Sequence, residues 1–198
     1  MRNGGRGMVM MGGSTLVEVL VSLLLLALGL LGASILHLTS LRARHESALL
    51  SSAVQLAAGM AERMRANSVL MHGPDAGNAY LGVSYEEPPD GAAPAPAGGP
   101  ACFGAAACSA AQLAQFDIAE WRQQLHASLP GARLHICRDV QAWDASAQGL
   151  HWTCSGGKGA PVVIKLGWRG RHANGQPVQN GDGVALPKLA LQVGGGGA

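Results

Sequence analysis

A single carboxylate stands at the edge of the most apolar stretch of this chain. Glu18 directly precedes residues 19–36, which read VLVSLLLLALGLLGASIL and contain no charged side chain. A carboxylate in the middle of a membrane costs about 2.5–3.5 kcal/mol on insertion scales, so it needs a partner there. Two interpretations follow. Glu18 either marks the solvated end of a helix or forms an ion pair with a positive group created nearby.

Four cysteines, all beyond residue 100, could form disulfides or hold a zinc ion. Three disulfide connectivities are open to four cysteines. We favour Cys102–Cys108 and Cys137–Cys154, because each pair closes a local loop and the second links neighbouring predicted strands. Paired zinc-binding cysteines lie about two to four residues apart, whereas five and sixteen residues separate the cysteines here. Disulfides are therefore favoured over zinc, and no metal site is predicted.

No other group of residues indicates catalysis. Residues 155–159, SGGKG, resemble a phosphate-binding loop in composition but lack its spacing and its following Ser or Thr. Asp117 and Glu120 lie three residues apart on a predicted helix, where we expect a solvated face. We find no convergent acid, base and nucleophile. The sequence therefore predicts neither an enzyme nor a cofactor.

The composition excludes several function classes. The chain has 198 residues, of which 48% are hydrophobic, 13% charged and 4% aromatic. This length suits one domain with an appendage and not a large multidomain enzyme. The formal net charge of +2 is too small for nucleic-acid binding by bulk electrostatics. No nucleic-acid partner is predicted.

The apolar run belongs to a longer predicted helix. Its 18 residues reach the lower edge of the roughly 17–25 that a membrane-spanning helix needs. The apolar region of a secretory signal has only about 7–15 residues, so we expect a retained helix. No proline occurs before Pro74, and the helix is predicted to run from about Ser14 to about Met71. Its second half has one apolar face, formed by Leu49, Ala53, Leu56, Met60 and Met64.

The remaining sequence predicts a small α+β head. Residues 73–101 are rich in Pro, Gly and Ala and indicate a loop, with a short strand or anchor point at residues 80–83. Ser109 and Gln112 fit a capping box that opens a helix, whose apolar stripe comprises Ala114, Ile118, Trp121, Leu125 and Leu129. Strands are predicted at 133–138, 162–168 and 189–193, and a weaker one at 150–154. These elements favour an antiparallel sheet packed on the long helix.

Two parts of the sequence resemble known pilins. The leader Arg2–Gly13, then STLVE at 14–18 and the apolar run, resembles the amino terminus of type IV pilins and pseudopilins, which usually have Phe in place of Ser14. The run CSAAQLAQFDIAEW at 108–121, followed by LPG at 129–131 and a later Cys137, resembles the family of the pilus modification protein PilV.

The resemblance implies how the amino terminus is processed and what Glu18 does. Prepilin peptidase would cut between Gly13 and Ser14 and methylate the new amine of Ser14. This positive amine would lie four residues before Glu18, and in such fibres the Glu pairs with the amine of a neighbouring subunit. Removing one partner of such a buried pair typically costs about 3–5 kcal/mol. Glu18 is therefore interpreted as an assembly residue and not as a catalytic acid.

The predicted organisation is a leader (1–13), a transmembrane helix half (14–38), an amphipathic stalk helix (39–72), a loop (73–101), an α+β head (102–193) and a tail (194–198). The fold class is α+β, type IV pilin-like. The basic end would stay in the cytoplasm and the head would enter the periplasm, where disulfides persist. From there the protein would join the extracellular pilus.

The resemblance implies a minor type IV pilin that supports assembly and priming of the fibre in a tip complex. Its partners would be other minor pilins, the major pilin, prepilin peptidase, the inner membrane and a tip adhesin. Two alternatives remain open: a minor pseudopilin of a type II secretion system, and a membrane-anchored periplasmic binding module.

Overall fold

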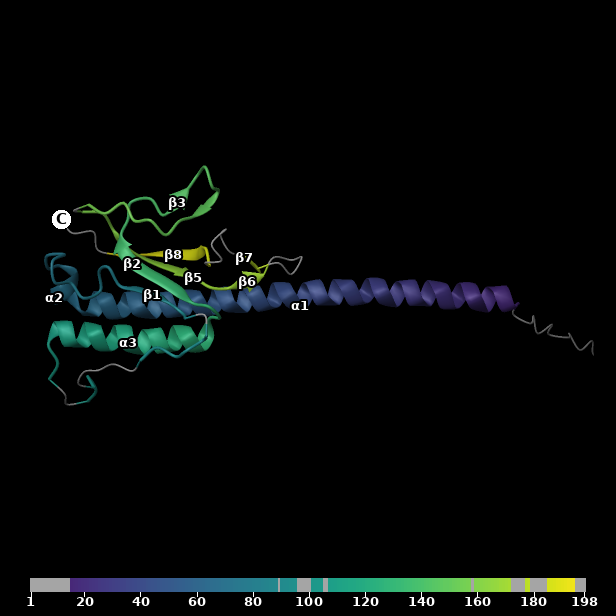
Figure 1. Ribbon diagram of the computed structural model, residues 1–198, viewed down its shortest axis with the longest axis horizontal. Helices are drawn as coiled ribbons and strands as arrows, with labels where there is room; N and C mark the ends of the chain where they lie inside the picture. The colour runs from purple at the N-terminus through teal and green to yellow at the C-terminus, as the bar shows by residue number, and fades with distance from the viewer. Residues whose placement is uncertain are drawn as a thin grey trace, which may run out of the picture. The chain divides into compact units, whose positions relative to one another are not determined.

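The computed structural model describes residues 15–88, 90–95, 101–104, 107–157, 159–171, 177–178 and 185–194. The chain divides into two compact units, Met1–Arg42 and Ala43–Ala198. The first contains the beginning of helix α1, and the second contains the end of α1 and all other elements (Figure 1). The predicted leader and most of the predicted tail lie outside the described residues.

Helix α1 (Leu16–Ala66) carries both the apolar run and the amphipathic pattern that follows it. The prediction that it extends to Met71 is wrong, because the helix ends at Ala66 and a separate turn, α2 (Ser68–Met71), follows. Asn67 interrupts the helix with φ −85° and ψ 59°. Its side-chain amide donates hydrogen bonds to the Tyr80 hydroxyl and the Ala110 carbonyl. The Asn67 backbone still donates to the Arg63 carbonyl at 3.1 Å and accepts from the Met71 N–H at 3.2 Å. The break therefore lies in the backbone dihedrals of Asn67, and its side chain is held by contacts with distant segments.

Helix α3 (Ala110–Ser128) begins where the capping box predicts. Ser109 Oγ accepts a hydrogen bond from the Gln112 backbone N–H, and the Gln112 side chain accepts one from the Ser109 N–H. The predicted apolar stripe is buried, as is the residue just beyond the helix: Ala114, Ile118, Trp121, Leu125 and Leu129. Local sequence therefore sets both the start and the buried face of α3.

A four-stranded antiparallel sheet has the order β1-β2-β5-β8 (Figure 1). Its strands are β1 (Ser84–Glu86), β2 (Arg133–Arg138), β5 (Val162–Gly167) and β8 (Pro187–Val193). Leu134 lies opposite Leu166, and Ile136 lies opposite Ile164, so one face of the sheet is apolar. Two short hairpins accompany the sheet: β3 (Trp143–Asp144) with β4 (Gly149–Leu150), and β6 (Gly170–Arg171) with β7 (Pro177–Val178).

The predicted strand at 150–154 is wrong. Pairing in this region stops with β4 at Leu150. The backbone carbonyls of His151 and Thr153 instead accept hydrogen bonds from the ammonium group of Lys165 on β5. A side chain therefore takes the acceptors that a neighbouring strand would need, and the chain crosses the sheet without joining it.

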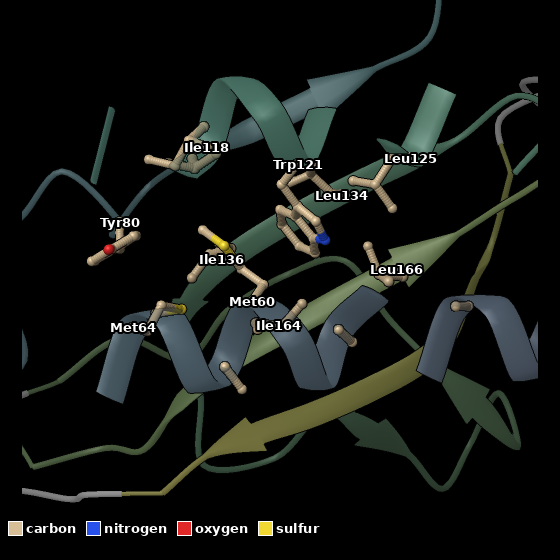
Figure 2. Packing of buried hydrophobic residues seen from close by; sticks show 14 of the residues in the cluster. Met60, Met64, Tyr80, Ile118, Trp121, Leu125, Leu134, Ile136, Ile164 and Leu166 are labelled. Atoms are coloured by element: carbon tan, nitrogen blue, oxygen red, sulfur yellow. The ribbon is translucent and has the colours of Figure 1, made fainter. Parts of the chain in front are cut away.

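The core of the second unit lies between the apolar face of the sheet and the helices. Figure 2 shows side chains from four elements pointing toward one another: Met60 and Met64 of α1, Ile118, Trp121 and Leu125 of α3, Leu134 and Ile136 of β2, and Ile164 and Leu166 of β5. Trp121 Nε1 also donates a hydrogen bond to the Leu56 carbonyl. Each buried large side chain stabilises the fold by about 1.5–3 kcal/mol. The methionines of α1 thus serve packing.

The loop after α2 contributes an anchor to this core, as predicted. Tyr80 is fully buried, and Val83 is nearly so. The strand in this loop lies slightly later than expected, because β1 begins at Ser84 and pairs with β2.

Candidate assembly segment and the disulfide-bonded head

Glu18 lies in the first turn of α1, at the start of the apolar run. Its side chain is exposed, and its backbone N–H donates to Thr15 Oγ1 at 3.4 Å. A carboxylate in the first helical turn interacts favourably with the positive end of the helix dipole. Gly13 and Ser14 lie outside the described residues, so the processing site predicted between them stays a prediction.

Every side chain from residue 15 to residue 42 is exposed. Among the described residues, α1 is the helix that is long and apolar enough to cross a membrane, and its best window of 18 residues has a mean hydropathy of 2.7. Apolar surface on this scale needs a cover, which a bilayer or the equivalent helices of other subunits can supply.

Three hydroxyl side chains in and just after the run are compatible with an apolar environment. Ser22 Oγ donates to the Glu18 carbonyl at 2.7 Å, Ser34 Oγ to the Leu30 carbonyl at 2.8 Å, and Thr39 Oγ1 to the Leu36 carbonyl at 2.9 Å. Each hydroxyl therefore finds its acceptor within the helix and needs no water. Glu18 is then the one Asp, Glu, Lys or Arg of the segment from Thr15 to Thr39.

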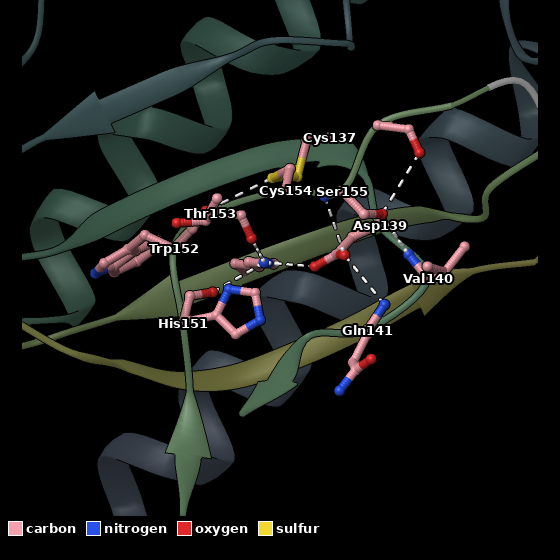
Figure 3. Close-up of a disulfide and its surroundings, with 11 residues drawn as sticks. Cys137, Asp139, Val140, Gln141, His151, Trp152, Thr153, Cys154 and Ser155 are labelled. Carbon is pink, nitrogen blue, oxygen red and sulfur yellow. Dashed lines mark hydrogen bonds and ion pairs between the residues drawn. A yellow bond between two sulfur atoms is a disulfide. The ribbon is translucent and has the colours of Figure 1, made fainter. Parts of the chain in front are cut away.

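The four cysteines form the two favoured disulfides. Cys102–Cys108 precedes α3, and Cys137–Cys154 joins the end of β2 to the segment that crosses the sheet (Figure 3). The ligand atoms of His135, Cys137 and Cys154 lie within 4.8 Å of one another. Thiolates are the metal ligands of cysteine, and joined sulfurs cannot supply them. The disulfide therefore leaves this cluster with one imidazole as a ligand.

Burial lowers the pKa of His135, and the positive charges of Lys165 and Arg133 lower it further. Its imidazole is accordingly neutral near pH 7, beside the disulfide.

Beneath this disulfide lies a buried ion pair. Lys165 Nζ is 2.6 Å from Asp139 Oδ2, and both side chains are fully buried. The same ammonium donates to the carbonyls of His151 at 2.8 Å and Thr153 at 2.7 Å, so a carboxylate and two carbonyl oxygens surround it (Figure 3). Asp139 Oδ1 accepts hydrogen bonds from the backbone N–H groups of Gln141 and Ser155.

The protonation of this pair follows from its contacts. Burial by itself would raise the pKa of the Asp139 carboxyl. The hydrogen bond and the charge of Lys165, with the two backbone N–H groups, outweigh burial and hold that pKa below its usual range. Asp139 is thus ionised at neutral pH and keeps its counter-charge.

A second polar cluster joins α1 to α3 and corrects one expectation. Asp117 was expected on a solvated face, but it is buried and accepts hydrogen bonds from Arg63 at 3.2 Å and from the Tyr80 hydroxyl at 3.0 Å. Arg63 also pairs with Glu120. The hydrogen bond that Arg63 donates to Glu120 raises the pKa of Arg63 more than burial lowers it, and burial raises the pKa of Tyr80. Asp117 and Glu120 therefore position α3 on α1.

Together, the long apolar amino-terminal helix and the small antiparallel head make this an α+β protein of type IV pilin-like fold. Residues 35–119 match the family model described as Tt1218-like, type IV pilin Tt1218. The match covers 85 of the 198 residues, and over this part the chain is similar to type IV pilins. It begins after Glu18 and ends within α3, so the expected processing and assembly residues lie outside it. No curated protein and no solved structure matches the chain.

Sequence reasoning missed the pair of Lys165 and Asp139. Lys165 occupies the second face of an alternating strand, a position that usually faces water. One available signal was the favoured disulfide, because Cys137–Cys154 folds the chain back across its own sheet and brackets Asp139. That fold covers the second face of β5, whose six residues are all buried.

Proposed function

We propose that this protein is a minor type IV pilin of the PilV kind, which supports assembly and priming of the fibre in a tip complex with other minor pilins. The observation that carries the proposal is the fully exposed apolar half of α1 with one carboxylate at its start. A helix of this kind can be held in the inner membrane and then transferred into a bundle of similar helices. The head, with its two disulfides, suits the periplasm and the extracellular fibre.

The proposed mechanism uses Glu18 as the residue that sets subunit register. Prepilin peptidase cuts between Gly13 and Ser14, and the new amine, methylated or not, carries the positive charge. In the assembled fibre, Glu18 of one subunit pairs with the Ser14 amine of a neighbour. Because a charge in an apolar bundle is costly without its partner, helices that are out of register are disfavoured.

Replacement of Glu18 tests this mechanism. The Glu18→Ala protein is expected to remain inserted in the membrane, because the substitution makes the helix more apolar. It should be absent from sheared pili, or reduced about tenfold or more, because the buried amine loses its partner. Immunoblots of membrane and fibre fractions provide the measurement, with Ser22→Ala as a control within the same helix. Normal incorporation of Glu18→Ala would remove the pairing argument.

Mass spectrometry of the amino terminus tests processing. Protein co-expressed with a prepilin peptidase is expected to begin at Ser14, with or without one added methyl group. A product that retains residues 1–13 would contradict the proposal and favour a membrane-anchored periplasmic module. Co-purification with pili, rather than with a type II secretion apparatus, separates a minor pilin from a minor pseudopilin.

A further inference from the structure

Residues 139–155, here called the clamped hairpin, leave the sheet after β2, form the β3–β4 hairpin and return across β5 (Figures 1 and 3). Two separate interactions hold the hairpin where it leaves and rejoins the sheet. The Cys137–Cys154 disulfide joins β2, just before the hairpin, covalently to the returning segment. The Asp139 carboxylate binds the backbone of Gln141 and Ser155 as well as Lys165, so it ties both ends to β5.

The clamped hairpin contributes little to the core that it is fastened to. The hydrophobic core cluster contains no described residue between Ile136 and Val162. A buried ion pair is weak evidence for stability, because desolvation offsets much of its attraction. A covalent bridge and a buried ion pair where the hairpin leaves and rejoins the sheet therefore indicate a need for a defined hairpin geometry.

The held hairpin exposes large apolar side chains. Val140 is 70% exposed and Trp143 is 53% exposed. Tryptophan is among the residues that contribute most to protein interfaces, and a rigid mounting lowers the entropy cost of binding. The turn is also set internally, because the Asp144 carboxylate accepts hydrogen bonds from the backbone N–H groups of Ser146 and Ala147.

The charge and size of this surface limit its partner. Asp139 is paired with Lys165. Hydrogen bonds from Ser146 and Ala147 lower the pKa of Asp144, which therefore keeps its negative charge at the surface beside Trp143. This charge disfavours a polyanion, and the apolar side chains favour an apolar partner surface. Trp143 and Val140 offer on the order of 100–200 Å², far below the roughly 800 Å² per partner of a stable free interface. Such a contact is useful between molecules that are already tethered, where the effective concentration reaches about the millimolar range.

We propose that the clamped hairpin presents Val140 and Trp143 to an apolar surface on the head of an adjacent pilin-type subunit in the same fibre. This inference rests on the proposed function, because the helices supply the tether. The hairpin contact selects which head lies next to this one, while Glu18 sets the register of the helices.

Site-specific photo-crosslinking in the full chain tests the contact. A benzophenone amino acid replaces Trp143 in cells that assemble fibres, and in a matched chain it replaces Val69, which is 71% exposed on α2. The probe at 143 is expected to yield an adduct whose partner peptide lies in the head of another pilin-type subunit. The probe at 69 should yield no such adduct.

A variant gives a second readout. Val140→Ser/Trp143→Ser should reduce the fibre-bound fraction about fivefold or more relative to Val69→Ser. Membrane levels should stay equal, since the replaced side chains are exposed.

The outcomes separate the inference from the proposed function. If the chain enters fibres but position 143 yields no head adduct, or yields one with a polysaccharide or a protein that is not a pilin, the inference is overturned and the proposed function stands. If the unaltered chain is absent from fibres, the hairpin contact and the proposed function are both overturned. An immunoblot of the fibre fraction shows this result without irradiation.

Discussion

Among single residues, the charge of Asp139 has the clearest measurable consequence. Its carboxylate is buried, accepts two backbone hydrogen bonds and faces Lys165 at 2.6 Å. Since these contacts hold the pKa of Asp139 below its unfolded value, the pair stabilises the fold above about pH 4. This stabilisation is lost as the pH falls through the lower pKa of the folded state.

Replacing Asp139 with Asn should therefore have a pH-dependent effect. At pH 7, Asp139→Asn is expected to lower the free energy of unfolding by about 3–5 kcal/mol, because Lys165 is left buried without its counter-charge. The difference from the unaltered protein should begin to shrink as the pH falls below about 4, because the carboxyl of the unfolded chain then binds a proton while the native carboxyl keeps its charge down to its lower pKa. Urea unfolding of the detergent-solubilised chain at several pH values measures this. A difference that does not change with pH would show that Asp139 acts through shape and not through charge.

Among the elements, α1 and β5 differ in how closely their backbones are packed. Gly59 on α1 has open space where a Cβ would stand. Gly167 ends β5 at a register shift, and a Cβ there would lie 2.6 Å from the Leu186 carbonyl oxygen and 2.8 Å from the Trp152 ring. The strand is covered on both faces, whereas this side of the helix is exposed.

The two glycines form a matched pair of tests. Gly167→Ala should destabilise the protein by about 1–3 kcal/mol, because backbone and ring must move to admit the methyl group. Gly59→Ala should be neutral or stabilise it by up to about 1 kcal/mol, because alanine favours the helix. Denaturant unfolding followed by tryptophan fluorescence measures the stability of both variants relative to the unaltered protein. Equal stability of the two variants would mean that the end of β5 is less tightly packed than described.

The whole molecule combines an apolar segment that depends on its surroundings with a head stabilised by its own core and disulfides. The two disulfides close loops of different length, with sequence separations of 6 and 17. A cross-link limits the freedom of the unfolded chain more when the loop is longer. The longer bridge also holds the clamped hairpin.

Removing the bridges one at a time should therefore have unequal effects. Cys137→Ser/Cys154→Ser is expected to cost roughly 3 kcal/mol and Cys102→Ser/Cys108→Ser roughly 2 kcal/mol. Thermal unfolding of both double variants provides the comparison. If the shorter bridge contributes more, the loop around Cys102–Cys108 has a structural role that chain entropy does not explain.

Features that depend on neighbours in the chain were predictable from the sequence. The apolar run, the buried stripe of α3 and the capping box at Ser109 follow from spacing over a few turns of helix. The favoured disulfides follow from short loops. The processing site at Gly13 and Ser14 and the role of Glu18 also come from the sequence, and they stay predictions.

Features that depend on distant partners were decided by the tertiary structure. Asn67 can be buried at the end of α1 because Tyr80 and Ala110 accept hydrogen bonds from its side chain. Asp117 is buried because Arg63 and Tyr80 meet it across helices. Lys165 can be buried because the disulfide brings Asp139 and two carbonyls over it. In each case the cost of burying a polar group is offset by partners whose approach no local pattern encodes.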